Sequence, residues 1–159
     1  MKKGICLKAG AAALVLAVFG GALFYLDREE QETPKTSMRI GVLLYRGDDT
    51  FIGTLRGAIE EEAKEYEMET GIKVTLDIMD AKGSQMTQNS QVERLISLGC
   101  DALCVNMVDR SAASGVIDKA MAEDIPIVFF NREPVEEDLD RWEKAYYVGT
   151  PAEEAGRLQ

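Results

Sequence analysis

The chain has 159 residues, enough for one domain with a buried core, and a formal net charge of −10 from 28 acidic and 18 basic residues. So acidic a surface is poorly suited to phosphate backbones, and we expect no nucleic-acid partner. The sequence contains no histidine, which excludes Ser-His-Asp and Cys-His nucleophiles and histidine-ligated metal sites. No pair of nucleophile and base is visible, so we do not expect an enzyme.

The first 26 residues have the pattern of an export signal. Three lysines within the first eight residues precede an uncharged apolar run over residues 9–26. Small residues at 20–22 offer a cleavage site, and the run is nearly long enough to span a bilayer, so both a cleaved signal peptide and a retained membrane anchor are open. In either case we expect the rest of the chain to be extracytoplasmic. Residues 27–37, "DREEQETPKTS", read as a polar linker.

From residue 38 onward, apolar strands alternate with amphipathic helices. Apolar residues at spacings of three and four predict a first helix from Ile52 that stops at Gly71, and further helices over residues 84–98 and from Ser111. Strands are expected over residues 39–45, 72–80, 102–107, 125–131 and 145–150. Most of these strands are apolar throughout, which indicates a parallel sheet covered on both faces. The predicted fold class is therefore α/β, a doubly wound parallel sheet with right-handed crossovers.

The alternation breaks after Asn131. The segment "REPVEEDLDRWEK" is charged and loop-like, and a helix with Pro151 in its first turn follows the last predicted strand. No helix stop signal precedes the end of the sequence. We therefore expect the chain to be an N-terminal piece of a longer protein.

Polar and aromatic residues follow the strands at the edge where open parallel sheets bind ligands. Carboxylates accept hydrogen bonds from hydroxyl groups, an asparagine can donate and accept, and an aromatic ring covers the apolar face of a sugar. This combination predicts a site for a neutral polyhydroxylated ligand. The residues concerned are Asp48, Asp49 and Phe51 after the first strand, Asp80 after the second, Asn106 and Asp109 after the third, and Asn131 after the fourth.

Helix capping is the alternative explanation for several of these residues. Asp and Asn are common in any turn between a strand and a helix, and this explains Asp48, Asp80 and Asp109 without a ligand. Asn106 is different, because it interrupts an apolar strand where a buried amide must find partners. Three arginines near the same edge leave two interpretations open, an acidic ligand or solvated loop charge: Arg46, Arg110 and Arg132.

Four segments together resemble the N-terminal lobe of the type I periplasmic sugar-binding proteins of ABC transporters, with the galactose/glucose-binding members as the nearest match. The segments are "RIGVLLYRGDDTFIGTLRGAIEEEAK", "ALCVNMVDRSAASGVIDKA", "IPIVFFNREP" and "KAYYVGTPAEEAG". The resemblance implies two doubly wound lobes that close on a monosaccharide. It also implies delivery of the sugar to a membrane permease, in some members a report to a chemoreceptor, and a monomeric protein.

The resemblance assigns roles to individual residues. It implies that the carboxylate of Asp49 binds sugar hydroxyls, that Phe51 stacks on the pyranose ring, and that Asn106 binds hydroxyls from the first lobe. It places Asn131 and Asp109 at the cleft edge or hinge.

The resemblance also divides the chain into lobes. Lobe 1 would cover residues 38–134, and residues 135–159 would be the hinge crossover and the start of lobe 2. The calcium loop of the family would lie in the missing part of lobe 2, so we expect no cofactor or metal in this chain.

Three other functions were considered beside the transport receptor. A membrane-tethered sugar-sensing ectodomain would use the same lobe and the retained apolar segment. A cytoplasmic sugar-responsive repressor would need a helix-turn-helix before Met38, where an apolar leader stands instead. An enzyme is disfavoured by the missing histidine.

Overall fold

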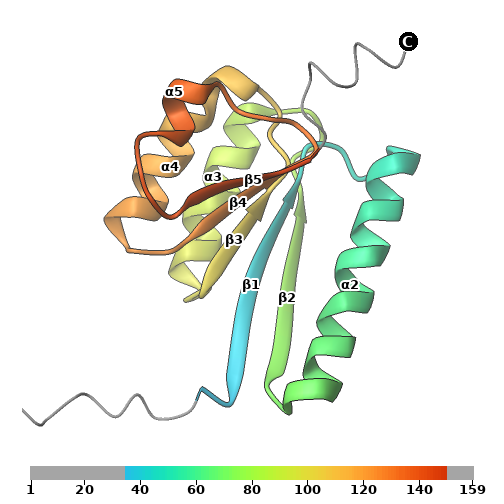
Figure 1. The fold of residues 1–159 in the computed structure, drawn as a ribbon. Coiled ribbons are helices and arrows are strands. Elements are labelled where there is room, and N and C mark those ends of the chain that lie inside the picture. The colour runs from blue at the N-terminus through green and yellow to red at the C-terminus, as the bar shows by residue number, and fades with distance from the viewer. Residues whose placement is uncertain (1–34, 150–159) are drawn as a thin grey trace, which may run out of the picture. The chain divides into compact units, whose positions relative to one another are not determined.

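Strands and helices alternate in the computed structural model, which describes residues 35–149 (Figure 1). The leader, most of the linker, and the helix predicted from Pro151 lie outside the described residues. In chain order the elements are β1 (Ser37–Leu44), α2 (Thr50–Thr70), β2 (Lys73–Asp80), α3 (Gln85–Ser97), β3 (Ala102–Val105), a 3₁₀ turn η1 (Arg110–Ala112), α4 (Ala113–Ala122), β4 (Ile127–Phe130), α5 (Glu136–Leu139) and β5 (Ala145–Val148).

The five strands form one parallel sheet in the order β2-β1-β3-β4-β5. The chain winds from β1 outward to β2, returns past β1 to β3, and continues in the opposite direction to β5. The doubly wound α/β prediction is confirmed.

Local signals set the ends of the first helix. The Asp49 side chain accepts hydrogen bonds from the first free N–H groups of α2, and Gly71 ends the helix with a φ of 72°. Glycine adopts this left-handed conformation without the penalty of a Cβ atom, so the predicted stop at Gly71 is correct. At 21 residues α2 is the longest helix of residues 35–149, yet neither it nor another helix in that range is apolar enough over sufficient length to cross a bilayer.

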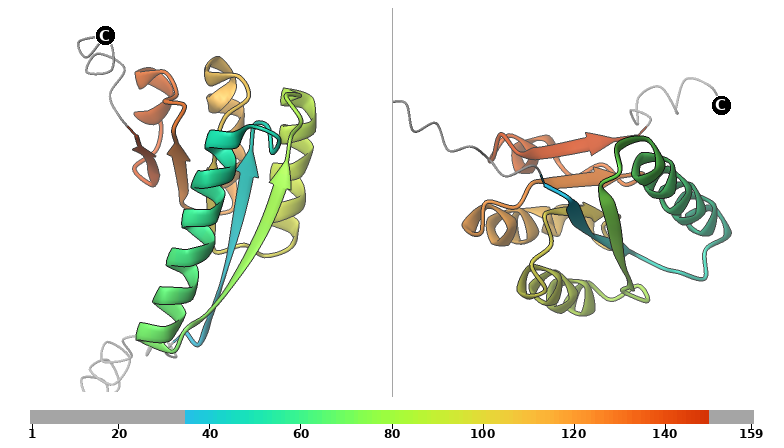
Figure 2. Two further views of the ribbon diagram at one scale, coloured as in Figure 1. Left: turned by 90° about the vertical axis from the view of Figure 1, so that its right-hand side faces the viewer. Right: turned by 90° about the horizontal axis from the view of Figure 1, so that it is seen from below.

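Helices cover both faces of the sheet, but unequally. Helices α3, α4 and α5 lie on one face, and α2 lies alone on the other (Figures 1 and 2). The larger core lies under α3 and α4 and includes Leu43, Leu95, Leu103, Val105, Met107, Val116, Ile117, Ile127 and Phe129. The smaller core, under α2, is built on Val42, Leu44 and Ile52.

The expected domain boundary after residue 134 is wrong for the described residues that follow it. Strand β5 pairs in parallel with β4, with Ile127 opposite Ala145, so it is the fifth strand of the same sheet. Ala145 and Tyr147 pack against the larger core, and the segment expected to be a loop contains the short helix α5. Ala145 and Tyr147, on one face of β5, thus keep this strand in the same lobe. The first residues of a second lobe would lie outside the described residues.

Two methionines allow a matched test of the core. Met107 is fully buried, whereas Met86 in the first turn of α3 is 79% exposed. We expect Met107→Ala to lower the free energy of unfolding by about 2 to 5 kcal/mol through lost apolar burial and the cavity left behind. Met86→Ala should leave it nearly unchanged, as measured by urea denaturation. Equal losses in the two variants would contradict the described packing.

Candidate functional site

The parallel pairing brings the carboxyl ends of the strands to one edge of the sheet, where the loops contact one another. The loop after β1 approaches the loop after β2 so closely that a Cβ atom on Gly47 would lie 2.9 Å from Oδ2 of Asp80. The carbonyl of Tyr45 accepts a hydrogen bond of 2.7 Å from the N–H of Gly83. Residues from separate strands therefore share one surface, as ligand sites in such sheets require.

Asp49 lies between β1 and α2 and has two sets of hydrogen bonds. Its Oδ1 accepts from the N–H groups of Phe51 and Ile52 at 2.9 and 3.1 Å, and its Oδ2 accepts from the hydroxyl of Tyr45. These bonds, with the Tyr45 hydroxyl as the largest cause, hold the pKa of Asp49 below its ordinary value. A carboxylate offers about four acceptor positions. Three are used, so an ionised Asp49 keeps an acceptor on Oδ2.

Phe51 presents its ring to solvent from the first turn of α2. Its side chain is 58% exposed, although it is a large apolar group. It lies two residues from Asp49, and its backbone N–H donates to the Asp49 side chain at the start of the helix. An exposed aromatic ring beside a half-buried carboxylate is suited to a ligand with one apolar face and several hydroxyl groups.

Asn106 does not present its amide at the surface. The residue is fully buried, its Oδ1 lies 3.4 Å from the N–H of Tyr45, and its Nδ2 donates to the carbonyl of Phe130 at 3.0 Å. Its own carbonyl accepts from Nε2 of Gln88, which is equally buried. The partners that an amide in an apolar strand must find are thus backbone groups of neighbouring strands. These contacts give Asn106 a structural role, and its predicted contact with sugar stays a prediction.

Asn131 is the amide that the edge exposes. It follows β4, has a φ of 63°, and its backbone is held by a bond from its N–H to the carbonyl of Val148. Asparagine tolerates this left-handed conformation better than most residues. The predicted place of Asn131 at the cleft edge or hinge stays a prediction.

Asp109 caps a helical turn, and Asp80 closes a tight turn. The Oδ1 of Asp109 accepts hydrogen bonds from the N–H and the hydroxyl of Ser111, which lowers the pKa of Asp109. Asp109 is the N-cap of the 3₁₀ turn that precedes α4. Asp80 accepts a hydrogen bond of 2.8 Å from the N–H of Lys82. Capping for Asp109 and turn formation for Asp80 therefore account for both residues without a ligand.

The three arginines at the edge already have partners. Arg46 forms a two-pronged ion pair with Asp48, at 3.0 and 2.9 Å, which lowers the pKa of that carboxyl. Arg110 donates to the carbonyl of Glu133. Arg132 donates to the carbonyls of Met107 and Val108 at 2.9 and 2.7 Å. These contacts account for the three arginines without an acidic ligand.

Tyr45 belongs to the site although the sequence did not single it out. Its hydroxyl contacts Asp49, and the guanidinium of Arg132 lies 4.9 Å from the centre of its ring. The sequence pattern places Tyr45 at the end of the strand predicted over residues 39–45, with no separate role. No sequence pattern predicts its contact with Arg132, because the two residues are 87 positions apart in the chain.

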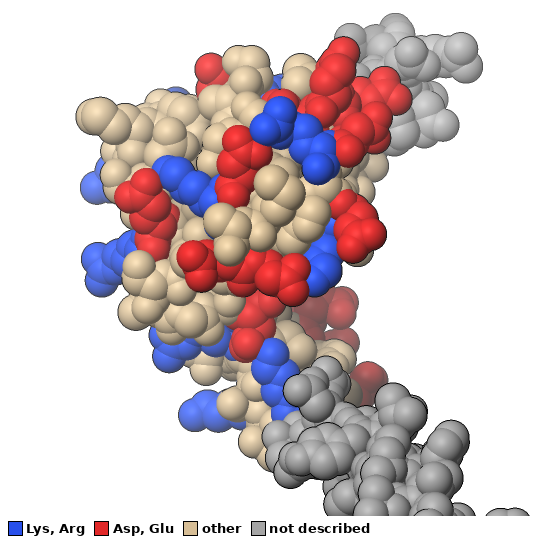
Figure 3. Space-filling view, turned by 90° about the vertical axis from the view of Figure 1, so that its left-hand side faces the viewer, with Lys and Arg blue, Asp and Glu red and all other residues tan. Residues whose placement is uncertain are grey.

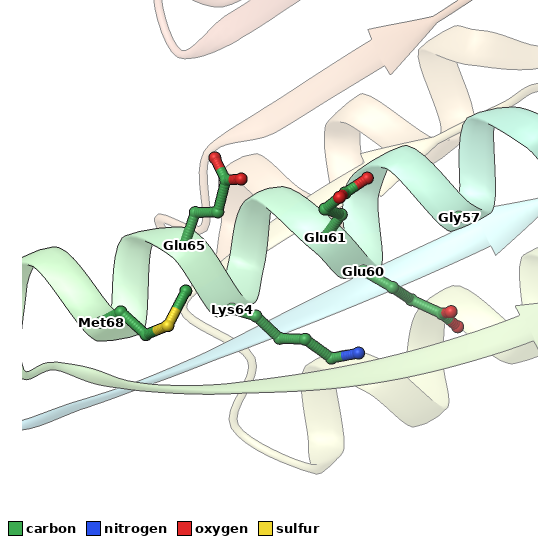
Figure 4. A pocket seen from close by; sticks show the side chains of 6 residues that line it. All are labelled: Gly57, Glu60, Glu61, Lys64, Glu65 and Met68. Carbon is green, nitrogen blue, oxygen red and sulfur yellow. The ribbon is translucent and has the colours of Figure 1, made fainter.

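Two other surfaces give no comparable combination of groups. A hollow on α2 is lined by Gly57, Glu60, Glu61, Lys64, Glu65 and Met68, all from that one helix (Figure 4). On the face that carries α4 and α5, acidic and basic side chains are interspersed (Figure 3). That face therefore offers no extended positive surface for a phosphate backbone.

The fold is that of a ligand-binding α/β lobe, and known proteins identify its family. The model of the family described as "periplasmic binding protein domain" matches residues 40–159, and the chain belongs to this family. It is 43% identical over 121 residues to the D-galactose/methyl-galactoside binding periplasmic protein MglB of Haemophilus influenzae. It is 33% identical over 130 residues to the ribose import binding protein RbsB of Bacillus subtilis. The predicted resemblance to sugar-binding proteins of this type is confirmed.

A solved structure has the same fold. An ABC transporter solute binding protein from Bacillus halodurans, with bound myo-inositol, is 27% identical with a TM-score of 0.63 over 79% of this chain. The match to MglB covers 76% of this chain and 35% of MglB, and the match to RbsB covers 79% of this chain and 41% of RbsB. This chain spans 43% of the Bacillus halodurans protein. These relatives are named as binding proteins for different polyols and sugars.

The buried amide of Asn106 can be tested by a nearly isosteric substitution. Asn106→Asp replaces the donor that faces the Phe130 carbonyl by a carboxylate oxygen, so it should cost about 2 to 4 kcal/mol at neutral pH. Burial raises the folded-state pKa of such a carboxyl above its unfolded value of about 3.9. The protonated acid can donate again, so the deficit should shrink as the pH falls toward that unfolded value.

Urea denaturation at neutral and acid pH measures both effects relative to the unsubstituted chain. The control is Asn89→Asp, since Asn89 is half-buried and its Oδ1 accepts from Gln85, which a carboxylate can also do. A pH-independent deficit in Asn106→Asp would contradict the buried position.

Proposed function

We propose that this chain is the first lobe of an extracytoplasmic solute-binding protein that captures a monosaccharide for an ABC transporter. The observation that carries the proposal is the pairing of Asp49 with Phe51: an ionised carboxylate with a remaining acceptor position lies two residues from a ring that is 58% exposed. The carboxylate would accept hydrogen bonds from sugar hydroxyls, and the ring would cover the apolar face of the pyranose.

Galactose or glucose is the sugar that we propose. The relative that is 43% identical is named for D-galactose and methyl-galactoside, whereas RbsB, at 33%, is named for ribose. A neutral sugar also agrees with the arginines, whose guanidinium groups contact Asp48 and backbone carbonyls. We propose that the exposed Asn131, in place of Asn106, supplies the amide of this lobe.

The remaining parts of the proposal concern the whole protein. A second lobe would close the cleft over the sugar, and the closed form would be recognised by the membrane subunits of an ABC permease and, in the sensing role, by a chemoreceptor. The protein would act as a monomer outside the cytoplasm and bind its ligand without chemical change. Any calcium site would lie in the second lobe.

The first test is a titration of the chain with D-galactose, D-glucose, D-ribose and myo-inositol, followed by NMR of the backbone amides. A single lobe should bind weakly, so millimolar sugar is needed. We expect galactose or glucose to shift the amides of the loops after β1, β3 and β4. Shifts confined to α5 and to the part of α2 beyond its first turn, or equal responses to all four compounds, would contradict a specific site at the carboxyl edge.

Phe51 provides a matched test of the stacking contact. Phe51→Ala should weaken sugar binding by roughly tenfold, because it removes the aromatic ring that would cover the apolar face of the pyranose. The control is Tyr146→Ala on β5, because Tyr146 is an aromatic residue of similar exposure, 52%, away from the carboxyl edge. The NMR titration measures both variants. Equal affinity of Phe51→Ala and the unsubstituted chain would exclude the ring from the site.

A further inference from the structure

The hydroxyl of Tyr45 has a role that neither the family match nor the sequence pattern assigns. Tyr45 directly follows β1 and contacts the ends of three other strands. Its carbonyl accepts from Gly83 after β2, its N–H lies 3.4 Å from Oδ1 of Asn106 after β3, and its ring lies under the guanidinium of Arg132 after β4. The backbone of Tyr45 is thus held by the loops after β2 and β3 and its ring by Arg132, which fixes the place of the residue at the edge.

The fixed hydroxyl is directed at the carboxylate that would receive the ligand. The N–H groups of Phe51 and Ile52 hold only Oδ1 of Asp49, which leaves the plane of the carboxylate free to turn about that oxygen. The bond from Tyr45 to Oδ2 fixes the plane. The remaining acceptor position on Oδ2 then points in one direction only.

We propose that Tyr45 is a positioning residue that fixes the orientation of the Asp49 carboxylate, and with it the hydroxyl pattern that the sugar must present. This inference rests on the proposed sugar-binding function. A phenol is suited to the task because it is a neutral donor: it orients the carboxylate without cancelling the negative charge that makes it a strong acceptor. A lysine or arginine in the same place would pair with the charge and compete with the ligand.

The charges around the pair maintain this arrangement over a wide pH range. The bond to Tyr45 lowers the pKa of Asp49, and the same bond, followed by burial, raises the pKa of Tyr45. The other charged groups that act on the pair are Arg46, which lowers the pKa of both residues, and Arg132, which lowers that of Tyr45, and the pKa of Tyr45 is still raised overall. Asp49 is therefore ionised and the Tyr45 hydroxyl protonated throughout the neutral range.

The test is Tyr45→Phe, which removes the hydroxyl and keeps the ring under Arg132. First, carbon-13 NMR follows the titration of the Asp49 carboxyl without sugar. Its pKa should rise toward the ordinary value, because its largest stabilising contact is lost. Tyr66→Phe is the matched control, since Tyr66 is exposed on the distant part of α2. It should leave the titration unchanged.

Second, the sugar titration is repeated across pH. At neutral pH the affinity of Tyr45→Phe for galactose should fall by about 3- to 10-fold, the loss typical of one hydrogen bond. Binding requires the ionised carboxylate, so the loss of binding on acidification should begin at a higher pH in Tyr45→Phe than in the unsubstituted chain. A merely structural tyrosine would not move this acid limb.

The outcomes separate the inference from the function on which it rests. An unchanged Asp49 titration in Tyr45→Phe, or a shifted titration with full sugar affinity and an unmoved acid limb, would overturn the positioning role. If no sugar binds to the unsubstituted chain while the Asp49 titration still shifts, the proposed function fails and the orientation of the carboxylate by Tyr45 stands.

Discussion

The parallel pairing of five strands is the constraint on which the site depends. In a parallel sheet every strand ends at the same edge, so each loop that leaves a strand begins beside its neighbours. The loops that follow the strands have no ladder hydrogen bonds to hold them beside one another. The buried amide of Asn106 continues the connection, since it contacts backbone groups that follow β1 and end β4.

Helix capping and the proposed ligand binding use the same residue types at this edge, and we propose that Asp49 does both. Two backbone N–H groups of α2 hold one of its oxygens, and the other oxygen contacts Tyr45 and keeps an acceptor position. Asp109 resembles it in sequence but its Oδ1 contacts only its own turn. The described contacts of Asp49 therefore involve both of its oxygens, whereas those of Asp109 involve Oδ1.

Contacts between distant segments account for what the sequence pattern did not predict. Asn106 was expected to bind ligand because an amide in an apolar strand needs partners, and its described partners are backbone groups, while the contact with a ligand stays a prediction. The exposed amide is Asn131, and Tyr45 and Arg132 form a contact across 87 positions. Burial and long-range pairing decide each case, and no local spacing reports either of them.

The sequence by itself determined the parallel α/β sheet, the end of the first helix at Gly71, and the edge at which polar groups gather. These features follow from apolar periodicity, capping and the chirality of crossovers, which act over a few residues or apply to all such sheets. The tertiary structure alone decided that β5 joins this sheet, which groups the buried amide of Asn106 contacts, and that Tyr45 contacts Asp49. These depend on which side chains meet after the strands assemble, and that is a property of packing in three dimensions.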